Sequence, residues 1–279
     1  MLGAIIGDIA GSRFEWREWK SKDFVLFAQD CHFTDDSLMT LAIASAFTLR
    51  KGAWHEADFQ NFVASRMVDV AKEYKDRRWW GENFYKWFMG DQKPYNSYGN
   101  GSAMRVSSVG WIAENEEEVK HFSRLVTEVS HNHPEGLKGA EAVAMAIYLG
   151  RTGHPMDEIR KRMEAYYPQI SSMTVDKIRP SCEIDTQGKF ITCQVSVPQA
   201  IVCFLEATSF EDAVRNAISL GGDADTQAAI AGSMAEAYFG IPYELEDEAI
   251  EFLPSNLKSI YFAFDTVKKK REKRKQVEK

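Results

Sequence analysis

Two short acidic segments, far apart along the chain, each stand directly before a helical pattern, and they constrain the fold more than any other feature. Residues 33–37 read Phe-Thr-Asp-Asp-Ser and run into an apolar pattern of helical period, and residues 221–226 read Gly-Gly-Asp-Ala-Asp-Thr and precede a run of small residues. One Thr or Asp at such a point is an ordinary N-cap, because its side-chain oxygen accepts from an unpaired backbone N–H. Neighbouring side chains do not share a cap, so the further carboxylates need another explanation.

Metal binding supplies that explanation if the two helix starts meet. The carboxylates concerned are Asp35, Asp36, Asp223 and Asp225. At about 4 Å each repulsive pair would cost roughly 4 kcal/mol at an effective dielectric constant near 20, which a marginally stable domain cannot absorb several times over. Because the ligands are oxygens only, the sequence predicts a hard cation, Mg²⁺ or Mn²⁺ rather than Zn²⁺, and more than one ion.

The composition is that of a globular protein with a large core. The chain has 279 residues, of which 44% are hydrophobic and 27% charged, so disorder over most of the length is excluded. A net charge of −7 argues against non-specific binding to a phosphate backbone, but not against one phosphorylated small molecule held through metal ions. The four cysteines lack C-x-x-C spacing and are sparse, which predicts reduced thiols in a cytoplasmic protein. The sequence shows no basic leader and no long apolar run, which predicts that the protein does not enter a membrane.

Helical periodicity dominates the chain and predicts a single, mainly α domain in which distant segments pack as neighbours. Residues 58–74 and 119–129 follow the helix period, and Pro198 is expected to open a buried helix over 199–207. The extended elements suggested are a brief run at residues 24–27 and a small hairpin around residues 187–188. We assign residues 1–265 to the domain and 266–279 to a basic C-terminal tail.

The N-terminal segment carries a glycine stripe and two acidic residues. Gly3, Gly7 and Gly11 recur at helical spacing, which predicts that another backbone packs very close to this helix. Asp8 and Glu15 are seven residues apart and lie near one face. A solvated polar face is the favoured interpretation of Asp8. Glu15 stays open between a solvated and a functional carboxylate.

Three further motifs are ambiguous on their own. The Gly-rich residues 96–102 offer backbone N–H groups that could cradle a phosphate, although a plain loop with Ser102 as N-cap is the commoner arrangement. His131 and His133 stand at a helix junction and are interpreted as junction residues or ligand contacts rather than metal ligands. The aromatic block over 79–88 favours core packing over a ring wall for a planar ligand.

Taken together, five motifs resemble those of the ADP-ribosylglycohydrolases, in the family's order. They are Gly-Asp-Ile-Ala-Gly-Ser-Arg-Phe-Glu at 7–15, Phe-Thr-Asp-Asp-Ser at 33–37, Ser-Tyr-Gly-Asn-Gly-Ser-Ala-Met-Arg at 97–105, His-Asn-His-Pro-Glu-Gly at 131–136 and Gly-Gly-Asp-Ala-Asp-Thr at 221–226. The resemblance extends from Gly3 to about Pro242. It implies an all-α, single-domain orthogonal helical bundle with two Mg²⁺ ions, for which Mn²⁺ can substitute, beside the scissile bond.

Position by position, the resemblance implies three sets of site residues. The implied metal ligands are Thr34, Asp35, Asp36, Asp223, Asp225 and Thr226. The implied catalytic residues are Glu15, Asp35 and Asp225, without a choice among them as acid or base. The implied substrate-binding residues are Ser97, Tyr98, Gly99, Asn100, Gly101, Ser102, Met104 and His131. Ser37 and Ala224 stand where the family usually has Thr and commonly has Ser, but Ser37 keeps a hydroxyl and Ala224 is not a ligand position.

The activity implied is Mg²⁺-dependent hydrolysis of the glycosidic bond between ADP-ribose and an acceptor. A protein arginine side chain is the favoured acceptor, and serine, a nucleic-acid base or a small acetyl conjugate stay open. We expect a monomer. The alternatives are a non-catalytic ADP-ribose-binding or immunity module, and a structural protein, on the same fold. The complete set of oxygen ligands argues against both.

Overall fold

The computed structural model describes residues 1–50, 52, 55–181 and 191–277. Within these ranges the regular structure is helical, and the only bridges, Arg17 with Gly222 and Gly99 with Thr192, are isolated. The prediction of an all-α fold is therefore confirmed. The α-helices are α1 (Leu2–Gly11), α2 (Asp35–Leu49), α3 (Glu56–Glu73), α4 (Glu82–Met89), α5 (Gly101–Met104), α6 (Ser107–Ile112), α7 (Glu116–Glu128), α8 (Pro134–Arg151), α9 (Met156–Tyr166), α10 (Val175–Ile178), α11 (Cys193–Leu205), α12 (Phe210–Ile218), α13 (Ala224–Phe239), α14 (Tyr243–Glu251) and α15 (Ser255–Val277).

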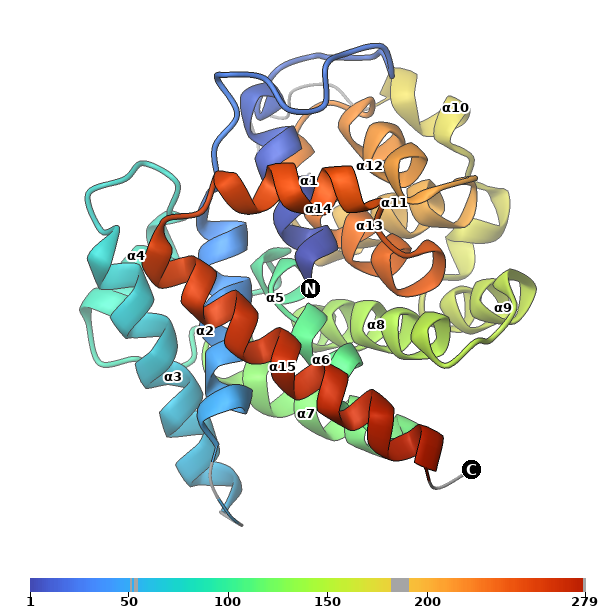
Figure 1. The fold of residues 1–279 in the computed structure, drawn as a ribbon. Helices are drawn as coiled ribbons and strands as arrows, with labels where there is room; N and C mark the ends of the chain where they lie inside the picture. The colour runs from blue at the N-terminus through green and yellow to red at the C-terminus, as the bar shows by residue number, and fades with distance from the viewer. Residues whose placement is uncertain (51, 53–54, 182–190, 278–279) are drawn as a thin grey trace.

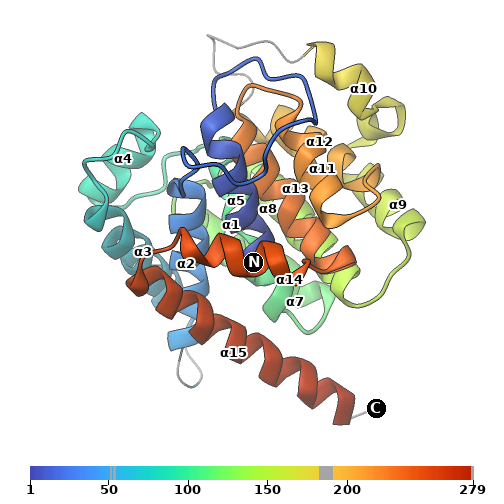
Figure 2. The same cartoon turned by 45° about the horizontal axis from the view of Figure 1, so that its top comes forward.

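A buried pair of helices, α1 and α13, forms the centre of the molecule. In both views α3 and α4 lie on one side of this pair, and α9 and α10 lie on the other (Figures 1 and 2). Every residue of α1 is buried, and so are residues 224–236 of α13. The amphipathic helix α12 packs one face against α13, and α7 packs one face against α8, which is the usual way to bury a helical stripe.

The glycine stripe of α1 allows its backbone to touch that of α13. A Cβ atom added to Gly3 would lie 2.2 Å from the Gly232 carbonyl oxygen, and one added to Gly7 would lie 2.1 Å from that of Ala228. A Cβ on Gly11 would lie 2.4 Å from the Asp225 Cα. The expectation of a close backbone contact is confirmed, and it brings the α1 face that carries Asp8 against the start of α13.

The expected helix start at Pro198 is wrong, because α11 begins five residues earlier, at Cys193. Pro198 lies inside the helix, where its missing N–H leaves the carbonyl of the preceding turn without its usual bond. The backbone bonds from Val195 and Ser196 to the Thr192 carbonyl start the helix, and buried side chains on both sides of Pro198 stabilise it. Tertiary packing thus overrides the local proline signal.

The last helix, α15, crosses in front of α2 and carries the basic run (Figure 1). Lys268 Nζ lies 3.3 Å from a Glu236 carboxylate oxygen, and Arg271 donates to the Ile112 carbonyl. The division at residue 265 stays a prediction. The predicted hairpin falls mainly on residues 182–190, outside the described residues.

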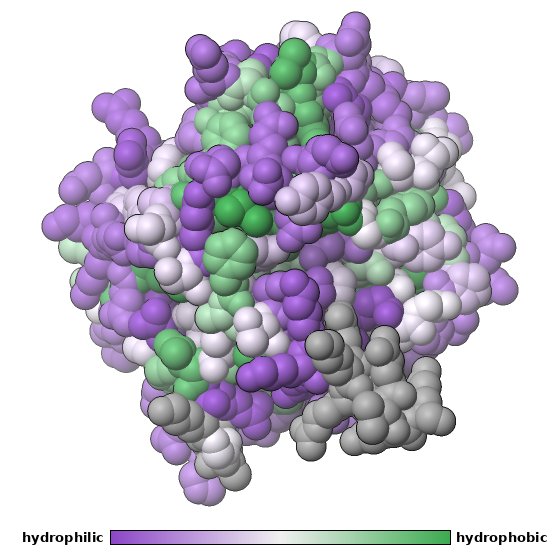
Figure 3. All heavy atoms as spheres, viewed as in Figure 1, coloured by the Kyte–Doolittle hydropathy of each residue, from purple (hydrophilic) through white to green (hydrophobic). Residues whose placement is uncertain are grey.

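The face shown in Figure 3 is mostly hydrophilic, with small separate apolar areas. Among the described helices, none is long and apolar enough to cross a membrane.

Candidate functional site

Asp8 of α1 holds the N-terminus of α2 in place through hydrogen bonds. Its side chain is buried, Oδ1 accepts a hydrogen bond from Thr34 Oγ1 at 2.6 Å, and Oδ2 accepts from the Thr34 N–H at 2.8 Å. Oδ2 also accepts from the N–H of Ser37 at 3.0 Å and from its hydroxyl. The interpretation of Asp8 as part of a solvated face was wrong, because α13 and α2 remove that face of α1 from water. Burial raises the pKa of Asp8, and these four hydrogen bonds oppose the rise.

The carboxylates of the first acidic segment point in different directions around the start of α2. Asp35 is partly exposed and lines a cavity, whereas Asp36 is buried. Asp36 Oδ2 accepts a hydrogen bond from Thr226 Oγ1 at 3.0 Å, which joins the two acidic segments directly. Asp36 Oδ1 is buried with no hydrogen-bond partner among the described residues. A buried carboxylate oxygen without a donor is a natural place for a cation.

The second acidic segment follows a turn of two glycines with left-handed backbone. Gly221 has φ of +75° and Gly222 of +70°, and the Gly222 carbonyl accepts from the N–H of Trp16 at 2.8 Å. This bond ties the Glu15 segment to the start of α13. Asp223 Oδ2 accepts from Asn100 Nδ2 at 2.5 Å, so the Gly-rich loop is also held at this point.

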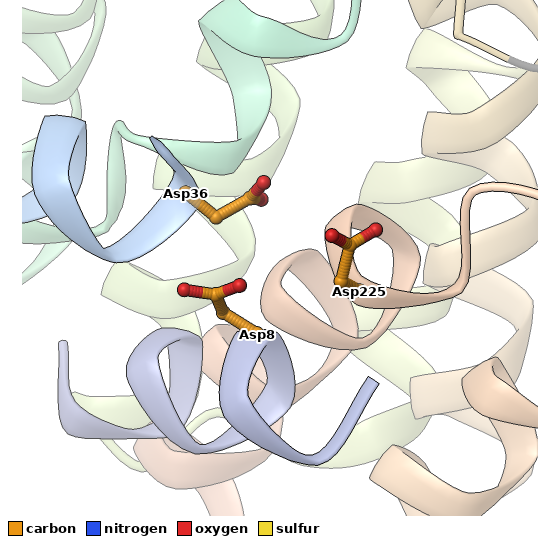
Figure 4. A group of neighbouring side chains, drawn as sticks. All are labelled: Asp8, Asp36 and Asp225. Carbon is orange, nitrogen blue, oxygen red and sulfur yellow. The ribbon is translucent and has the colours of Figure 1, made fainter. Parts of the chain in front are cut away.

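The two acidic segments meet, as the sequence predicted. Two groups of three carboxylates each offer oxygens that all lie within 4.8 Å of one another in the described structure. One group is Asp8, Asp36 and Asp225, whose carboxylates project toward a common space from α1, α2 and α13 (Figure 4). The other is Glu15, Asp223 and Asp225. Asp225 belongs to both groups and therefore lies between two candidate ion positions.

The electrostatics of this cluster fit divalent cations. Burial, followed by repulsion from Glu15 and Asp223, raises the pKa of Asp225 well above its ordinary value. Burial raises the pKa of Glu15 to about 7, with Asp223 as the next cause. Asp35 and Asp36 are shifted in the same direction, again by burial first. Hard cations with oxygen ligands would remove this repulsion, and the donor set contains no sulfur or imidazole that would favour zinc.

A cavity of about 400 Å³ opens beside the carboxylates, a size that suits one small molecule. Most of the predicted site residues line it: Glu15, Asp35, Asp36, Ser97, Gly99, Asn100, Gly101, Met104, His131, Asp223, Asp225 and Thr226. The structure thus brings the acidic segments, the Gly-rich loop and the first histidine of the junction to one place.

Three of the predicted site residues do not line this cavity. The Thr34 hydroxyl is committed to Asp8, and the Ser102 hydroxyl is buried and donates to the Gly136 carbonyl at 2.9 Å. Tyr98 is 48% exposed and packs edge-on against His133, with ring centroids 5.2 Å apart. These contacts stabilise the fold around the three side chains. Their roles as a metal ligand and as substrate-binding residues stay predictions.

The cavity also contains residues that the sequence reasoning did not assign to the site. Trp79 and Phe84 of the aromatic block line it, together with Trp16, Tyr95 and Arg105. The core interpretation of the block holds for Phe84, which is buried and also faces the cavity. Arg105 is the last residue of the motif at 97–105, but a lone arginine in a sequence does not indicate that its side chain will be buried on a cavity wall.

Known proteins resemble this chain over most of its length. Residues 1–253 match the ADP-ribosylglycohydrolase family. The chain is similar to ADP-ribosylhydrolase ARH3 of Homo sapiens, with 26% identity over 86% of this chain and 84% of the relative, and to its counterpart in Mus musculus, with 25% identity over 86% and 83%. It is also similar to ADP-ribosylarginine hydrolase Tri1 of Pseudomonas putida, with 24% identity over 86% of this chain and 70% of that protein.

A solved structure described as an ADP-ribosylglycohydrolase-related protein complex has a similar fold. It matches with a TM-score of 0.65 and 20% identity, over 94% of each chain. At this identity the likeness concerns the fold alone.

Proposed function

Since the chain belongs to the ADP-ribosylglycohydrolase family and is an enzyme that hydrolyses ADP-ribose linkages, we propose that it does so with two Mg²⁺ ions and acts on ADP-ribosylated arginine side chains of proteins. The observation that carries the proposal is the pair of three-carboxylate groups that share Asp225 at the cavity floor. Arginine is favoured because its guanidinium needs little protonation to leave, and one relative, ADP-ribosylarginine hydrolase Tri1 of Pseudomonas putida, is named for that linkage.

The residues that would hold the two ions differ in part from those the motifs implied. One ion would take Asp8, Asp36 and Asp225, and the other Glu15, Asp223 and Asp225. Thr34, Thr226 and Asp35 remain candidate ligands at the edge of these groups. Bound there, the ions would supply Lewis-acid charge to the ribose hydroxyls and to the attacking water.

The remaining chemistry falls to the chain's own side chains. Glu15 lines the cavity, so its carboxyl is a candidate to exchange a proton with the leaving group or the water, through an oxygen that the ion would leave free. Carboxylates around the ribose would stabilise the positive charge of an oxocarbenium-like transition state. Asp35 lines the same cavity from α2 and is the second candidate acid or base. Gly99 and Gly101 would receive the pyrophosphate, because they line the cavity without side-chain bulk, whereas the Asn100 N–H already donates to the Ile191 carbonyl at 2.8 Å.

Release of free ADP-ribose tests the proposal. Separate substrates would carry ADP-ribose on arginine, serine, an acetyl group or a nucleic-acid base, each assayed with Mg²⁺ and with EDTA. We expect release from ADP-ribosyl-arginine that EDTA abolishes and added Mg²⁺ restores. Calorimetric binding of ADP-ribose with cleavage of no linkage would instead support a binding module, and undiminished turnover in EDTA would refute the metal assignment.

A further inference from the structure

Arg105 is a buried cation on the wall of the cavity. Its side chain is 1% exposed, and burial lowers its pKa only to about 10, so it stays charged at neutral pH. One terminal nitrogen donates to Ser130 Oγ at 2.7 Å, and its carbon Cζ lies 5.8 Å from the Phe84 ring centroid. Its Nε has no partner among the described residues. A buried guanidinium costs free energy, so a function for it at this position is worth seeking.

Ser130 connects this arginine to His131. The Ser130 hydroxyl lies 2.8 Å from His131 Nδ1 and is fully buried. A guanidinium only donates, so Ser130 Oγ must accept from Arg105. If Ser130 also accepted from Nδ1, its own proton would lack an acceptor in a dry environment, which costs about 1–3 kcal/mol. The serine therefore donates to Nδ1.

This arrangement decides which nitrogen of His131 carries a proton. Burial and the nearby Arg105 charge lower the pKa of His131 well below its ordinary value, so the ring is neutral and has one N–H. Since Nδ1 accepts, Nε2 carries the proton. Nε2 faces the Gly-rich loop: a Cβ on Gly101 would lie 3.3 Å from it, and one on Gly99 would lie 3.6 Å away.

We propose that Arg105 and Ser130 are positioning residues that hold His131 as the Nε2–H tautomer, so that it donates a hydrogen bond to a phosphate oxygen of the ligand in the glycine loop. The identity of the ligand rests on the function proposed above. The tautomer itself does not, because it follows from the order of donors and acceptors in the free protein. Tyr95 supports the ring from one side, with centroids 5.5 Å apart at 62°.

Long-range ¹H–¹⁵N correlation spectra of ¹⁵N-histidine-labelled protein test the tautomer directly. The chain has six histidines, and the His131 signals are assigned by their loss in His131→Asn. We expect the chemical shifts of an Nε2–H tautomer that do not titrate between pH 6 and 8. An Nδ1–H tautomer in the wild-type protein would overturn the inference.

Ser130→Ala tests the relay, with Ser108→Ala as the matched control. Ser108 is also a buried serine, but its hydroxyl has no hydrogen-bond partner in the described structure. We expect Ser130→Ala to give a mixture of tautomers and about tenfold weaker binding of ADP-ribose by calorimetry, the loss of one hydrogen bond, and to bind the same number of Mg²⁺ ions. Ser108→Ala should match the wild type in both readouts.

A Ser130→Ala protein with a pure Nε2–H tautomer and unchanged affinity would overturn the positioning role. A wild-type protein with the expected tautomer but no affinity for ADP-ribose would overturn the proposed function and the ligand named here. The two failures are therefore distinguishable.

Discussion

The two acidic helix starts reach the same cavity by different means. We call each acidic helix start, with the residues that hold it, a corner. The α2 corner is held by one side chain, because the Asp8 carboxylate accepts four hydrogen bonds from Thr34 and Ser37. The α13 corner is held by backbone, through the left-handed Gly221 and Gly222 and the bond between the Gly222 carbonyl and the Trp16 N–H. A buried carboxylate in this site can therefore stabilise the fold through hydrogen bonds, as Asp8 does, or destabilise it through burial and repulsion, as Asp225 does. Burial alone does not distinguish the two cases.

The largest expected effect separates the shared carboxylate from an unshared one. Asp225 belongs to both three-carboxylate groups, whereas Asp36 belongs to one. We expect Asp225→Asn to weaken the binding of both ions and Asp36→Asn to weaken one, by calorimetric Mg²⁺ titration. Turnover should fall about 10³-fold or more in each, because bound metal contributes several kcal/mol to transition-state stabilisation. Full activity of Asp225→Asn would show that the site assignment is wrong.

The same two corners should respond in opposite directions when stability is measured without metal. Asp8→Asn replaces an acceptor of four hydrogen bonds with a group that also donates, so it should lower the free energy of unfolding by about 2–4 kcal/mol. Asp225→Asn removes a charge that burial, and then repulsion from neighbouring carboxylates, disfavours, so it should raise the free energy of unfolding by about 1 kcal/mol. Urea unfolding in EDTA measures both. Equal destabilisation by the two variants would contradict the distinction between the corners.

The metal-free protein should lose stability as the pH rises from about 4.5 to 7. The pKa of Glu15 is raised from an ordinary value of 4.5 to about 7, so in this interval the folded state binds more protons than the unfolded state. Stability then falls with rising pH, by roughly 1–3 kcal/mol for one such group. Urea unfolding across this range in EDTA measures it. Saturating Mg²⁺ should flatten the curve, and an unchanged slope would mean that the carboxylates do not bind the ion.

The smallest effect concerns the backbone of the α13 corner. Gly222→Ala places a Cβ at a φ of +70° with no atom within 4 Å, so its cost is conformational, about 1 kcal/mol. Gly153→Ala is the control, because Gly153 also has a positive φ, +84°, and open space around its Cβ position. Both variants should lose similar stability in urea. Only Gly222→Ala should also raise KM for the ADP-ribosylated substrate, and equal kinetics would mean that this turn does not position the site.

Much of the local structure could be predicted because it depends on neighbours in the chain. The helices expected over 58–74 and 119–129 are α3 and α7, displaced by a few residues, and the glycine stripe of α1 indicated its close backbone contact. Periodicity and small side chains report such features directly. Pro198 misled for the same reason, since a local signal takes no account of packing.

The amino-acid pattern alone was enough to predict the helical class and the two acidic helix starts, because a surplus of carboxylates at a helix start has no local use. Packing in three dimensions was needed to show that Asp8 belongs with them and that Arg105 is joined to His131 through Ser130 on the cavity wall. A single charged residue on a helix has the same pattern whether water or another helix covers it. Its role is fixed by what removes the water, and here that is the packing of α1, α2 and α13.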